Sequence, residues 1–418
     1  MRRSAKNPAQ FRGGRASSEV AVPFEAAAHD PTPIAFNDLP LDHRLRSGVA
    51  DRGFERTTPI QSAVFPLVFD GTDLIACAET GTGKTAAFLL PLMQRLLAAP
   101  ASGRTRALVL APTRELAVQI EDDFTGFAYH TTLTSVAVYG GVDGDLQARA
   151  LRAGADMVVA TPGRLLDHMS TGIVDFGHVE VLVLDEADRM LDMGFWPDVR
   201  RIVSSLPARR QTLLFSATTS SDVVQLAEQV MSSPKFLQIG RAGGPARTIT
   251  HLAHALPAAE KTDWLASFLR RHREPTLVFV RTKRFADRLA STLASRGIRC
   301  AALHADRTQA DRTAAVEGFR AGRHRTLVAT DIAARGLDID GIEHVINYEV
   351  PHGPDAYVHR AGRTGRAEAT GIALTLVAPD ELPALQAIER AIGTPIREPD
   401  ADAGLPSPSR GTGQASRG

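Results

Sequence analysis

The chain has 418 residues, 44% of them hydrophobic, and is therefore long enough to form two domains, each with its own core. Its 48 basic and 47 acidic residues nearly balance, which excludes a global basic field, so a nucleic-acid site must come from local clustering. Cys77 and Cys300 give neither a disulfide framework nor a zinc cluster, and no signal peptide or apolar run of about eighteen residues is present. We expect a soluble, cytoplasmic protein that has no membrane contact and acts as a monomer.

The order of apolar and polar segments predicts two domains between disordered ends. Residues 1–33 are rich in Arg, Ala, Ser, Gly and Pro, and they lack the apolar periodicity needed to offset the entropy of ordering. Short continuous apolar runs alternate with helical patterns over residues 34–239, as in parallel strands covered on both faces. Residues 240–247 have linker composition, the alternation resumes over 248–393, and 394–418 are predicted to be a disordered tail. We predict an α/β fold with two parallel sheets.

A glycine-rich loop follows the first apolar run of the first predicted domain. Gly81 and Gly83 allow backbone N–H groups to turn inward around an anion. Lys84 supplies a positive charge for the β- and γ-phosphates, and Thr85 supplies a hydroxyl for Mg²⁺. Ala78 stands where the general phosphate-loop pattern has a glycine, so a simple turn entering a helix remains an alternative.

Two carboxylates follow the apolar run 181–184. At the end of a buried strand, Asp185 is suited to hold Mg²⁺ and Glu186 to orient an attacking water. Such an acidic cluster is more often a solvated turn. The phosphate loop in the same chain favours the Mg²⁺ interpretation.

These two motifs carry a family resemblance. Residues 185–188 spell Asp-Glu-Ala-Asp, and residues 78–85 spell Ala-Glu-Thr-Gly-Thr-Gly-Lys-Thr, which explains the missing first glycine. Over about residues 36–377 the chain resembles the DEAD-box RNA helicases. The resemblance implies two tandem RecA-like domains, ATP and Mg²⁺ as cofactors, RNA as partner, and ATP and RNA sites in and across the cleft between the domains.

The resemblance also implies the nucleotide contacts. The segment from Gly53 to Gln61 looks like the family's Q motif, in which the glutamine recognises adenine; Thr57 stands where the family often has proline. Arg363 and Arg366 would act as fingers on the γ-phosphate and, with Lys84 and Glu186, as catalytic residues. The full set of implied nucleotide-binding residues is Phe36, Phe54, Gln61, Thr80, Gly81, Thr82, Gly83, Lys84, Thr85, Gly336, Asp338, Arg363 and Arg366.

Further matching motifs imply RNA-binding and coupling residues. Hydroxyls, arginines and glycine amides at strand ends are suitable donors for phosphate oxygens. The implied RNA contacts are Thr113, Arg114, Gly140, Gly141, Thr161, Arg164, Arg281, Arg312 and Thr330, with Gln309 beside Arg312. The residues implied to couple hydrolysis to strand separation are Asp188, Ser216, Thr218 and His359.

The predicted function is therefore an ATP-dependent RNA helicase that separates short duplexes locally when its domains close. An ATP-gated RNA clamp or annealing chaperone would keep every motif. A DNA helicase of the same superfamily would usually lack the Gln61 segment and the Asp188 variant of the acidic motif. The short termini resemble those of the compact bacterial RhlE type, and the RNA target stays open.

Overall fold

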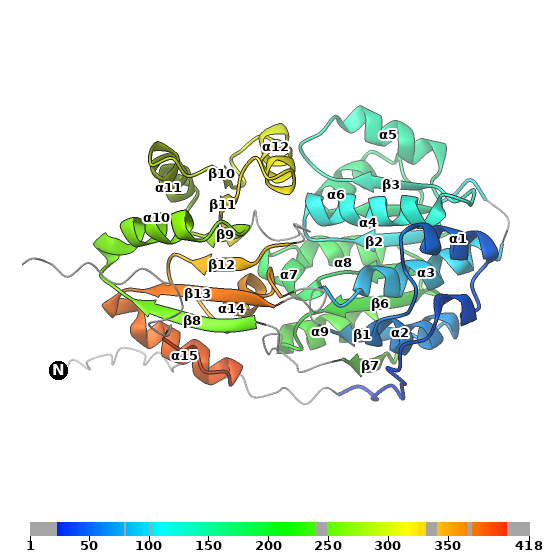
Figure 1. Cartoon of the computed structure of the whole chain (residues 1–418). Helices are drawn as coiled ribbons and strands as arrows, with labels where there is room; N and C mark the ends of the chain where they lie inside the picture. Colours follow the sequence, from blue (N-terminus) through cyan, green and yellow to red (C-terminus); the bar gives the residue numbers. More distant parts are fainter. Residues whose placement is uncertain are drawn as a thin grey trace, which may run out of the picture.

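The computed structural model describes residues 23–78, 81–99, 102–239, 249–331, 341–365 and 370–398, and these form two α/β domains that lie side by side (Figure 1). The first domain contains a seven-stranded sheet with the order β3-β4-β2-β5-β6-β1-β7, in which all neighbours are parallel. Its strands are β1 (Leu74–Cys77), β2 (Ala107–Leu110), β3 (Ser135–Val138), β4 (Met157–Ala160), β5 (Val181–Leu184), β6 (Gln211–Ser216) and β7 (Lys235–Gln238).

Helices cover both faces of this sheet. One face packs against α1 to α4 and the other against α5, α6, α8 and α9. In the described part of the first domain, the helices are η1 (Phe36–Asp38), α1 (His43–Asp51), α2 (Pro59–Phe69), α3 (Lys84–Leu97), α4 (Arg114–Ala128), α5 (Gly144–Ala153), α6 (Pro162–Ser170), α7 (Ala187–Asp192), α8 (Trp196–Ser204) and α9 (Ser221–Val230).

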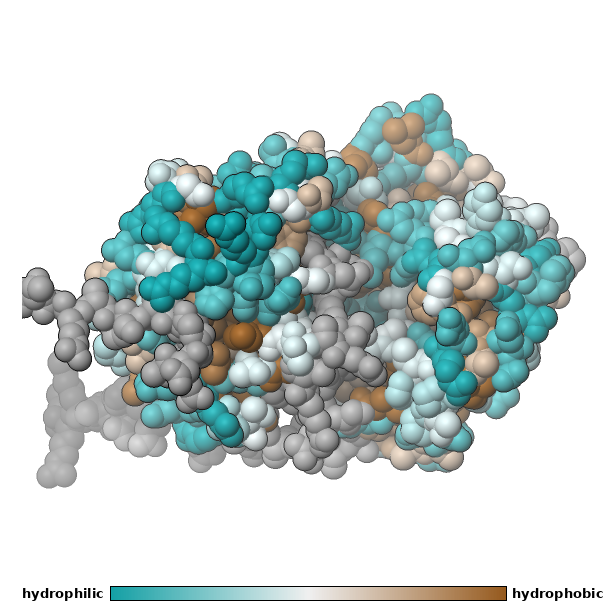
Figure 2. All heavy atoms as spheres, in the orientation of Figure 1, coloured by the Kyte–Doolittle hydropathy of each residue, from teal (hydrophilic) through white to brown (hydrophobic). Residues whose placement is uncertain are grey.

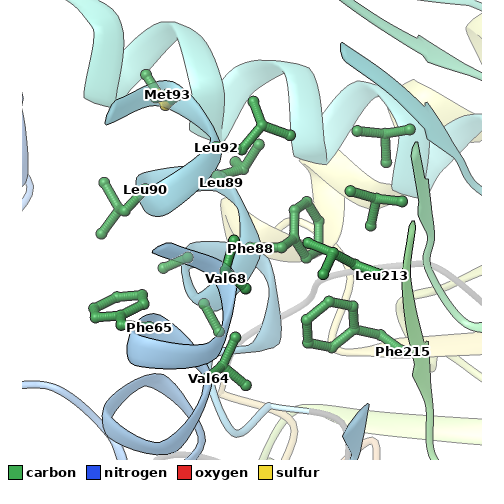
Figure 3. Close-up of a cluster of buried hydrophobic side chains, with 14 of the residues drawn as sticks. Val64, Phe65, Val68, Phe88, Leu89, Leu90, Leu92, Met93, Leu213 and Phe215 are labelled. Atoms are coloured by element: carbon green, nitrogen blue, oxygen red, sulfur yellow. The ribbon is translucent and has the colours of Figure 1, made fainter. Parts of the chain in front are cut away.

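The apolar runs are continuous because successive residues of each central strand enter opposite cores. Val183 of β5 faces the core on the α1–α4 side, whereas Leu182 and Leu184 face the core on the other side. In Figure 3, side chains of α2 and α3 meet Leu213 and Phe215 of β6, and the rings of Phe88 and Phe215 lie 5.3 Å apart. Burial on both faces fixes the strands at the base of the phosphate loop and the acidic motif.

The second domain contains a six-stranded parallel sheet with the order β10-β11-β9-β12-β13-β8. Its strands are β8 (Ile249–Ala255), β9 (Thr276–Phe279), β10 (Cys300–Leu303), β11 (Thr326–Ala329), β12 (His344–Asn347) and β13 (Gly371–Val377). The helices described there are η2 (Ala258–Glu260), α10 (Lys261–Arg271), α11 (Lys283–Ser295), α12 (Gln309–Arg320), α14 (Pro354–Ala361), η3 (Pro379–Glu381) and α15 (Leu382–Ile392). Helices α10 and α11 cover one face, and α12, α14 and α15 cover the other.

The predicted α/β class with two parallel sheets is confirmed, but two predicted bounds are wrong. The leader was expected to extend to residue 33, yet Ala26 pairs with Phe236 of β7 and Ala27 is buried. The tail was expected to start at residue 394, yet Ile396 is buried and Arg397 pairs with Leu252 of β8. In both places the chain uses the free edge of a sheet, which composition does not reveal. The predicted linker 240–247 lies outside the described residues.

The face of the molecule in Figure 2 is mainly hydrophilic, and its hydrophobic residues occur in small groups. This distribution agrees with the concentration of apolar side chains in the cores on the two faces of each sheet. Among the described residues, none of the helices has the length and apolar character needed to cross a membrane.

Candidate functional site

The phosphate loop connects β1 to α3 through glycines in the left-handed conformation. Gly81 has a φ of 83° and Gly83 a φ of 91°, values that favour glycine because other residues would place a Cβ in a strained position. Helix α3 begins at Lys84, directly after Gly83, so its positive end points towards the loop. The ammonium of Lys84 is buried and donates a hydrogen bond of 2.9 Å to the carbonyl oxygen of Ala78. The loop and its cation therefore form one compact unit.

Gln61 ties the Q-motif segment to this loop. Its amide oxygen accepts from the backbone N–H of Thr58 at 2.9 Å, and its amide nitrogen donates to the carbonyl oxygen of Gly83 at 3.1 Å. A Cβ on Gly83 would lie only 2.5 Å from that nitrogen. Gln61 is 1% exposed, so in this structure it is a buried residue that helps to hold the loop in place.

The two aromatic residues predicted beside Gln61 differ in exposure. Phe36 is 2% exposed, and its ring lies 5.9 Å from that of Phe54 and 6.3 Å from that of Phe65. Phe36 is thus a core residue that offers no exposed face to a base, and this structure does not support it as a nucleotide contact. Phe54 is partly exposed and packs against the same core.

The acidic motif lies where β5 ends and α7 begins. Glu186 has a φ of 51°, a conformation that costs a non-glycine residue about 1–3 kcal/mol. Its backbone N–H donates to a carboxylate oxygen of Asp185 at 2.9 Å, which helps to hold the turn. Burial, with the negative charge of Glu186, raises the pKa of Asp185 to about 7. The positive charge near Asp185 is therefore too small to offset the burial of its carboxylate beside that of Glu186.

Cationic side chains of both domains lie near Glu186 and lower its pKa. Burial alone raises the pKa of its carboxyl group. The charges of Arg189, Arg363 and Lys84 outweigh this effect, so the pKa lies well below its usual value. Arg189 of α7 forms an ion pair with Glu186, the residue that precedes the helix, and is 1% exposed. Arg363 comes from the second domain and is 5% exposed, so the two domains meet at the carboxylate predicted to orient water.

Asp188 connects the acidic motif to the Ser-Ala-Thr segment after β6. One of its carboxylate oxygens accepts from the backbone N–H groups of Ala217 at 3.0 Å and Thr218 at 3.1 Å, and from the Thr218 hydroxyl at 3.3 Å. The Ser216 hydroxyl donates to the Thr218 carbonyl oxygen at 2.8 Å. The predicted coupling residues of the first domain therefore form one hydrogen-bonded unit.

The fourth predicted coupling residue, His359 of α14, faces this unit from the second domain. It is 8% exposed, and burial lowers its pKa, while the charge of Asp188 acts in the opposite direction. Neighbouring Arg360 anchors α14 by donating two hydrogen bonds to Asp331, at 2.6 and 2.7 Å, and one to Asn347 at 3.1 Å. These contacts orient the helix that precedes Arg363.

The predicted RNA contacts of the first domain, except Gly141, line a cleft of about 380 Å³ that is also lined by the second domain. The Thr113 hydroxyl accepts from the N–H of Leu116 and so keeps its own hydrogen available for a phosphate oxygen. The lining of the cleft includes Thr113, Arg114, Glu115, Gly140, Thr161, Arg164, Ala305, Arg307 and Arg312.

Arginine side chains cover the glycine loop beside this cleft. A Cβ on Gly141 would lie 2.0 Å from a terminal nitrogen of Arg114, and one on Gly144 would lie 2.9 Å from Arg164. Gly141 also has a φ of 86°, which favours glycine there, whereas a Cβ on Gly140 would lie 3.5 Å from Arg114 in ordinary contact.

The predicted RNA residues of the second domain do not all line this cleft. Arg312 lines the cleft and forms an ion pair of 2.7 Å with Glu115 of the first domain. Thr330 is 6% exposed at the end of β11. Arg281 is not among the residues that line this cleft. Its backbone N–H donates to the carboxylate of Glu349, and its guanidinium lies 3.7 Å from the carboxylate of Glu381.

Sequence reasoning missed three members of this site. Arg189 could have been found, because it lies three residues after Glu186, within the first turn of the helix that Glu186 precedes. Glu115 and Asp331 carry no such local signal, since their partners Arg312 and Arg360 are distant in the chain. Thr80, Gly336, Asp338 and Arg366 lie outside the described residues, as does the side chain of Gln309.

Comparisons with known proteins decide the family. A model described as DEAD/DEAH box helicase matches residues 58–226, and a model described as Helicase conserved C-terminal domain matches residues 260–368. The ATP-dependent RNA helicase CshA of Listeria monocytogenes is 44% identical over 355 residues, which cover 85% of this chain and 68% of the relative. The chain belongs to the DEAD-box RNA helicases.

Solved structures agree with this assignment. The structure of S. cerevisiae Dbp5 bound to RNA and ADP BeF3 has a TM-score of 0.80 and 31% identity, and covers 87% of this chain and 95% of that chain. The structure of Mss116p bound to ssRNA and AMP-PNP has a TM-score of 0.82 and 28% identity, and covers 90% of this chain and 81% of that chain. This DEAD-box protein is an ATP-dependent RNA helicase with two RecA-like domains, and that prediction is confirmed.

Proposed function

We propose that this helicase hydrolyses ATP only when its two domains meet, and that RNA promotes this meeting. The observation that carries the proposal is the convergence of the two domains on the acidic motif. Glu186 belongs to the first domain, whereas Arg363 and His359 belong to the second. Neither domain alone contains both the carboxylate and the arginine.

Mg²⁺ fits the donor set at this site. Thr85 contributes a hydroxyl next to the phosphate loop and Asp185 a carboxylate at the end of β5, and such hard oxygen atoms are the ligands that Mg²⁺ prefers. The raised pKa of Asp185 is consistent with a site that gains from added positive charge. When bound, the ion would neutralise charge on the phosphates.

The protein's own groups would divide the remaining work. The phosphate loop and Lys84 would hold the ATP phosphates. Glu186 would accept a hydrogen bond from the attacking water, because its lowered pKa keeps it charged at neutral pH. Arg363 would stabilise the charge that develops on the transferred phosphoryl group. Its origin in the second domain makes this stabilisation dependent on closure.

RNA would favour the same closed arrangement because its cleft is also lined by both domains. Two ligands that each favour one state strengthen each other's binding. Donors such as Thr113, Arg114 and Arg164 suit backbone phosphates, so binding should depend little on sequence. We propose that closure bends one bound strand, so that a short duplex separates locally. With two free cysteines, the chain also suits the reducing cytoplasm, where we propose that it works.

The test compares RNA with matched single-stranded DNA as activators of ATP hydrolysis, at one salt concentration. RNA should stimulate strongly and DNA weakly, because the 2′-hydroxyl distinguishes the two polymers at otherwise identical contacts. Unwinding of short duplexes should exceed that of long ones. Equal stimulation by DNA, or unwinding that is independent of length, would contradict the proposal. ATP-dependent RNA retention without unwinding would favour the clamp instead.

A further inference from the structure

Three side chains with metal-ligand chemistry converge at the amino end of the second sheet. His272 directly follows α10, Glu274 lies in the turn before β9, and His344 begins β12. One ligand atom from each residue lies within 4.8 Å of the others. The ATP and RNA residues follow the carboxyl ends of strands, so this cluster lies at the opposite end of its sheet.

The backbone around the cluster is fixed by the sheet. Strands β9 and β12 are parallel neighbours, with His344 opposite Thr276. The N–H of His344 donates to the carbonyl oxygen of Pro275 at 3.2 Å, and the Thr276 hydroxyl donates to that of Glu274 at 2.9 Å. The turn that carries two of the ligands is therefore tied to the strand that carries the third.

Phe268 supports both imidazole rings. The ring of His272 stacks on that of Phe268, with centroids 4.3 Å apart and planes 26° from parallel. The ring of His344 meets Phe268 edge-on at 5.3 Å, and the two histidine rings lie 5.5 Å apart. Both imidazoles are thus held in place by packing before any ligand binds.

Polar atoms of all three residues have no hydrogen-bond partner within the described part of the chain. These atoms are Nε2 of His272, Oε2 of Glu274 and Nδ1 of His344, and each is buried. His344 itself is only 7% exposed. A buried polar atom left unsatisfied costs about 1–3 kcal/mol, so three in one place call for an explanation. A cation shared by the three side chains would relieve part of this cost.

We propose that His272, Glu274 and His344 form a binding site for a divalent transition metal, best suited to Zn²⁺. Two imidazoles and one carboxylate match the nitrogen and oxygen ligands of Zn²⁺, and a water would complete a tetrahedron. Ligand atoms about 2.1 Å from one ion lie about 3.4 Å apart in that geometry. The three ligand atoms already lie within 4.8 Å of one another, and the 41% exposed side chain of Glu274 has room to close the remaining gap.

The site stabilises the second domain and takes no part in the reaction. It would connect the end of α10 to the start of β12, which are 72 residues apart along the chain when counted from His272 to His344. A ligand that binds only the folded state raises the unfolding temperature. The low cysteine number gave no hint of zinc, and the three ligands carry no recognisable spacing because the fold brings them together.

The test uses the full chain without a polyhistidine tag, stripped of metal with a chelator and returned to Zn²⁺. The variants are His272→Gln and Glu274→Gln, which remove a ligand from partly exposed positions. His352→Gln, at an exposed site elsewhere in the second domain, serves as the control. Metal content after gel filtration, affinity by competition with a coloured chelator, and the shift in unfolding temperature are measured for each protein.

Wild type and His352→Gln should retain one Zn²⁺ per chain and unfold at a higher temperature with the metal. Each ligand variant should bind at least about tenfold more weakly and lose the shift, while its RNA-stimulated ATPase stays unchanged. Bound Co²⁺ should give the intense absorption of a tetrahedral site in wild type and His352→Gln, but not in the two ligand variants. Absence of stoichiometric binding by wild type, or equal binding by the ligand variants, would overturn the proposal.

Discussion

The interior of each domain and the boundary between the domains are built from different interactions. Inside the first domain, α2, α3 and β6 pack large apolar side chains such as Phe88 and Phe215 without exposure. Across the boundary, the contacts described above are charged or polar: Arg312 with Glu115, and Arg363 and His359 with the acidic motif. Apolar cores keep each domain folded at all times, whereas a few charged contacts leave closure responsive to ligands.

Replacing Arg363 with Ala should give the largest effect on catalysis. The substitution removes the second domain's charge beside Glu186 and leaves the phosphate loop intact. We expect kcat to fall by about 10³-fold, with KM for ATP changed only a few-fold, because such an arginine acts mainly on the transition state. Arg390→Ala, at an exposed position of α15, is the control. A large rise in KM with kcat preserved would contradict the assigned role.

Replacing Asp188 with Asn tests the unit inside the first domain. One carboxylate oxygen accepts from Ala217 and Thr218, and the other accepts from the N–H of Arg189 at 3.0 Å. An amide has only one oxygen, so its NH₂ group must face a donor. We expect a loss of about 1–3 kcal/mol in unfolding free energy and a larger loss of unwinding than of ATPase. Exposed Asp70→Asn is the control, and equal stability and unwinding in both variants would contradict this account.

The smallest effect should come from the ion pair between Glu115 and Arg312. Glu115 pairs with Arg312 inside the RNA cleft and would repel phosphates. Glu115→Gln should therefore increase RNA affinity a few-fold at low salt, and Arg312→Ala should decrease it. RNA titrations at two salt concentrations measure both changes, with exposed Glu317→Gln as control. A weaker affinity in Glu115→Gln would show that the pair aids binding instead.

Features carried by short continuous segments were predictable from the sequence. The strands, the phosphate loop and the position of Asp185 and Glu186 at the end of β5 depend on neighbouring residues, and the structure places these groups as expected. Contacts between distant segments were not predictable. The ion pair of Glu115 with Arg312, the burial of Phe36 and the ordered residues 23–33 all depend on which surfaces meet after folding. The cluster of His272, Glu274 and His344 was not predicted for the same reason, because its residues come from separate segments of the chain.

The central claim is that the catalytic site is complete only when the two domains meet. The most direct test compares ATP hydrolysis by the full chain with that of a fragment comprising residues 23–239, which contains the whole first sheet and both of its cores. Circular dichroism and thermal unfolding should first show that the fragment is folded. At saturating RNA and ATP, we predict that the full chain turns over and the folded fragment stays near background, because it lacks Arg363. Hydrolysis by the folded fragment at a rate close to that of the full chain would contradict the account.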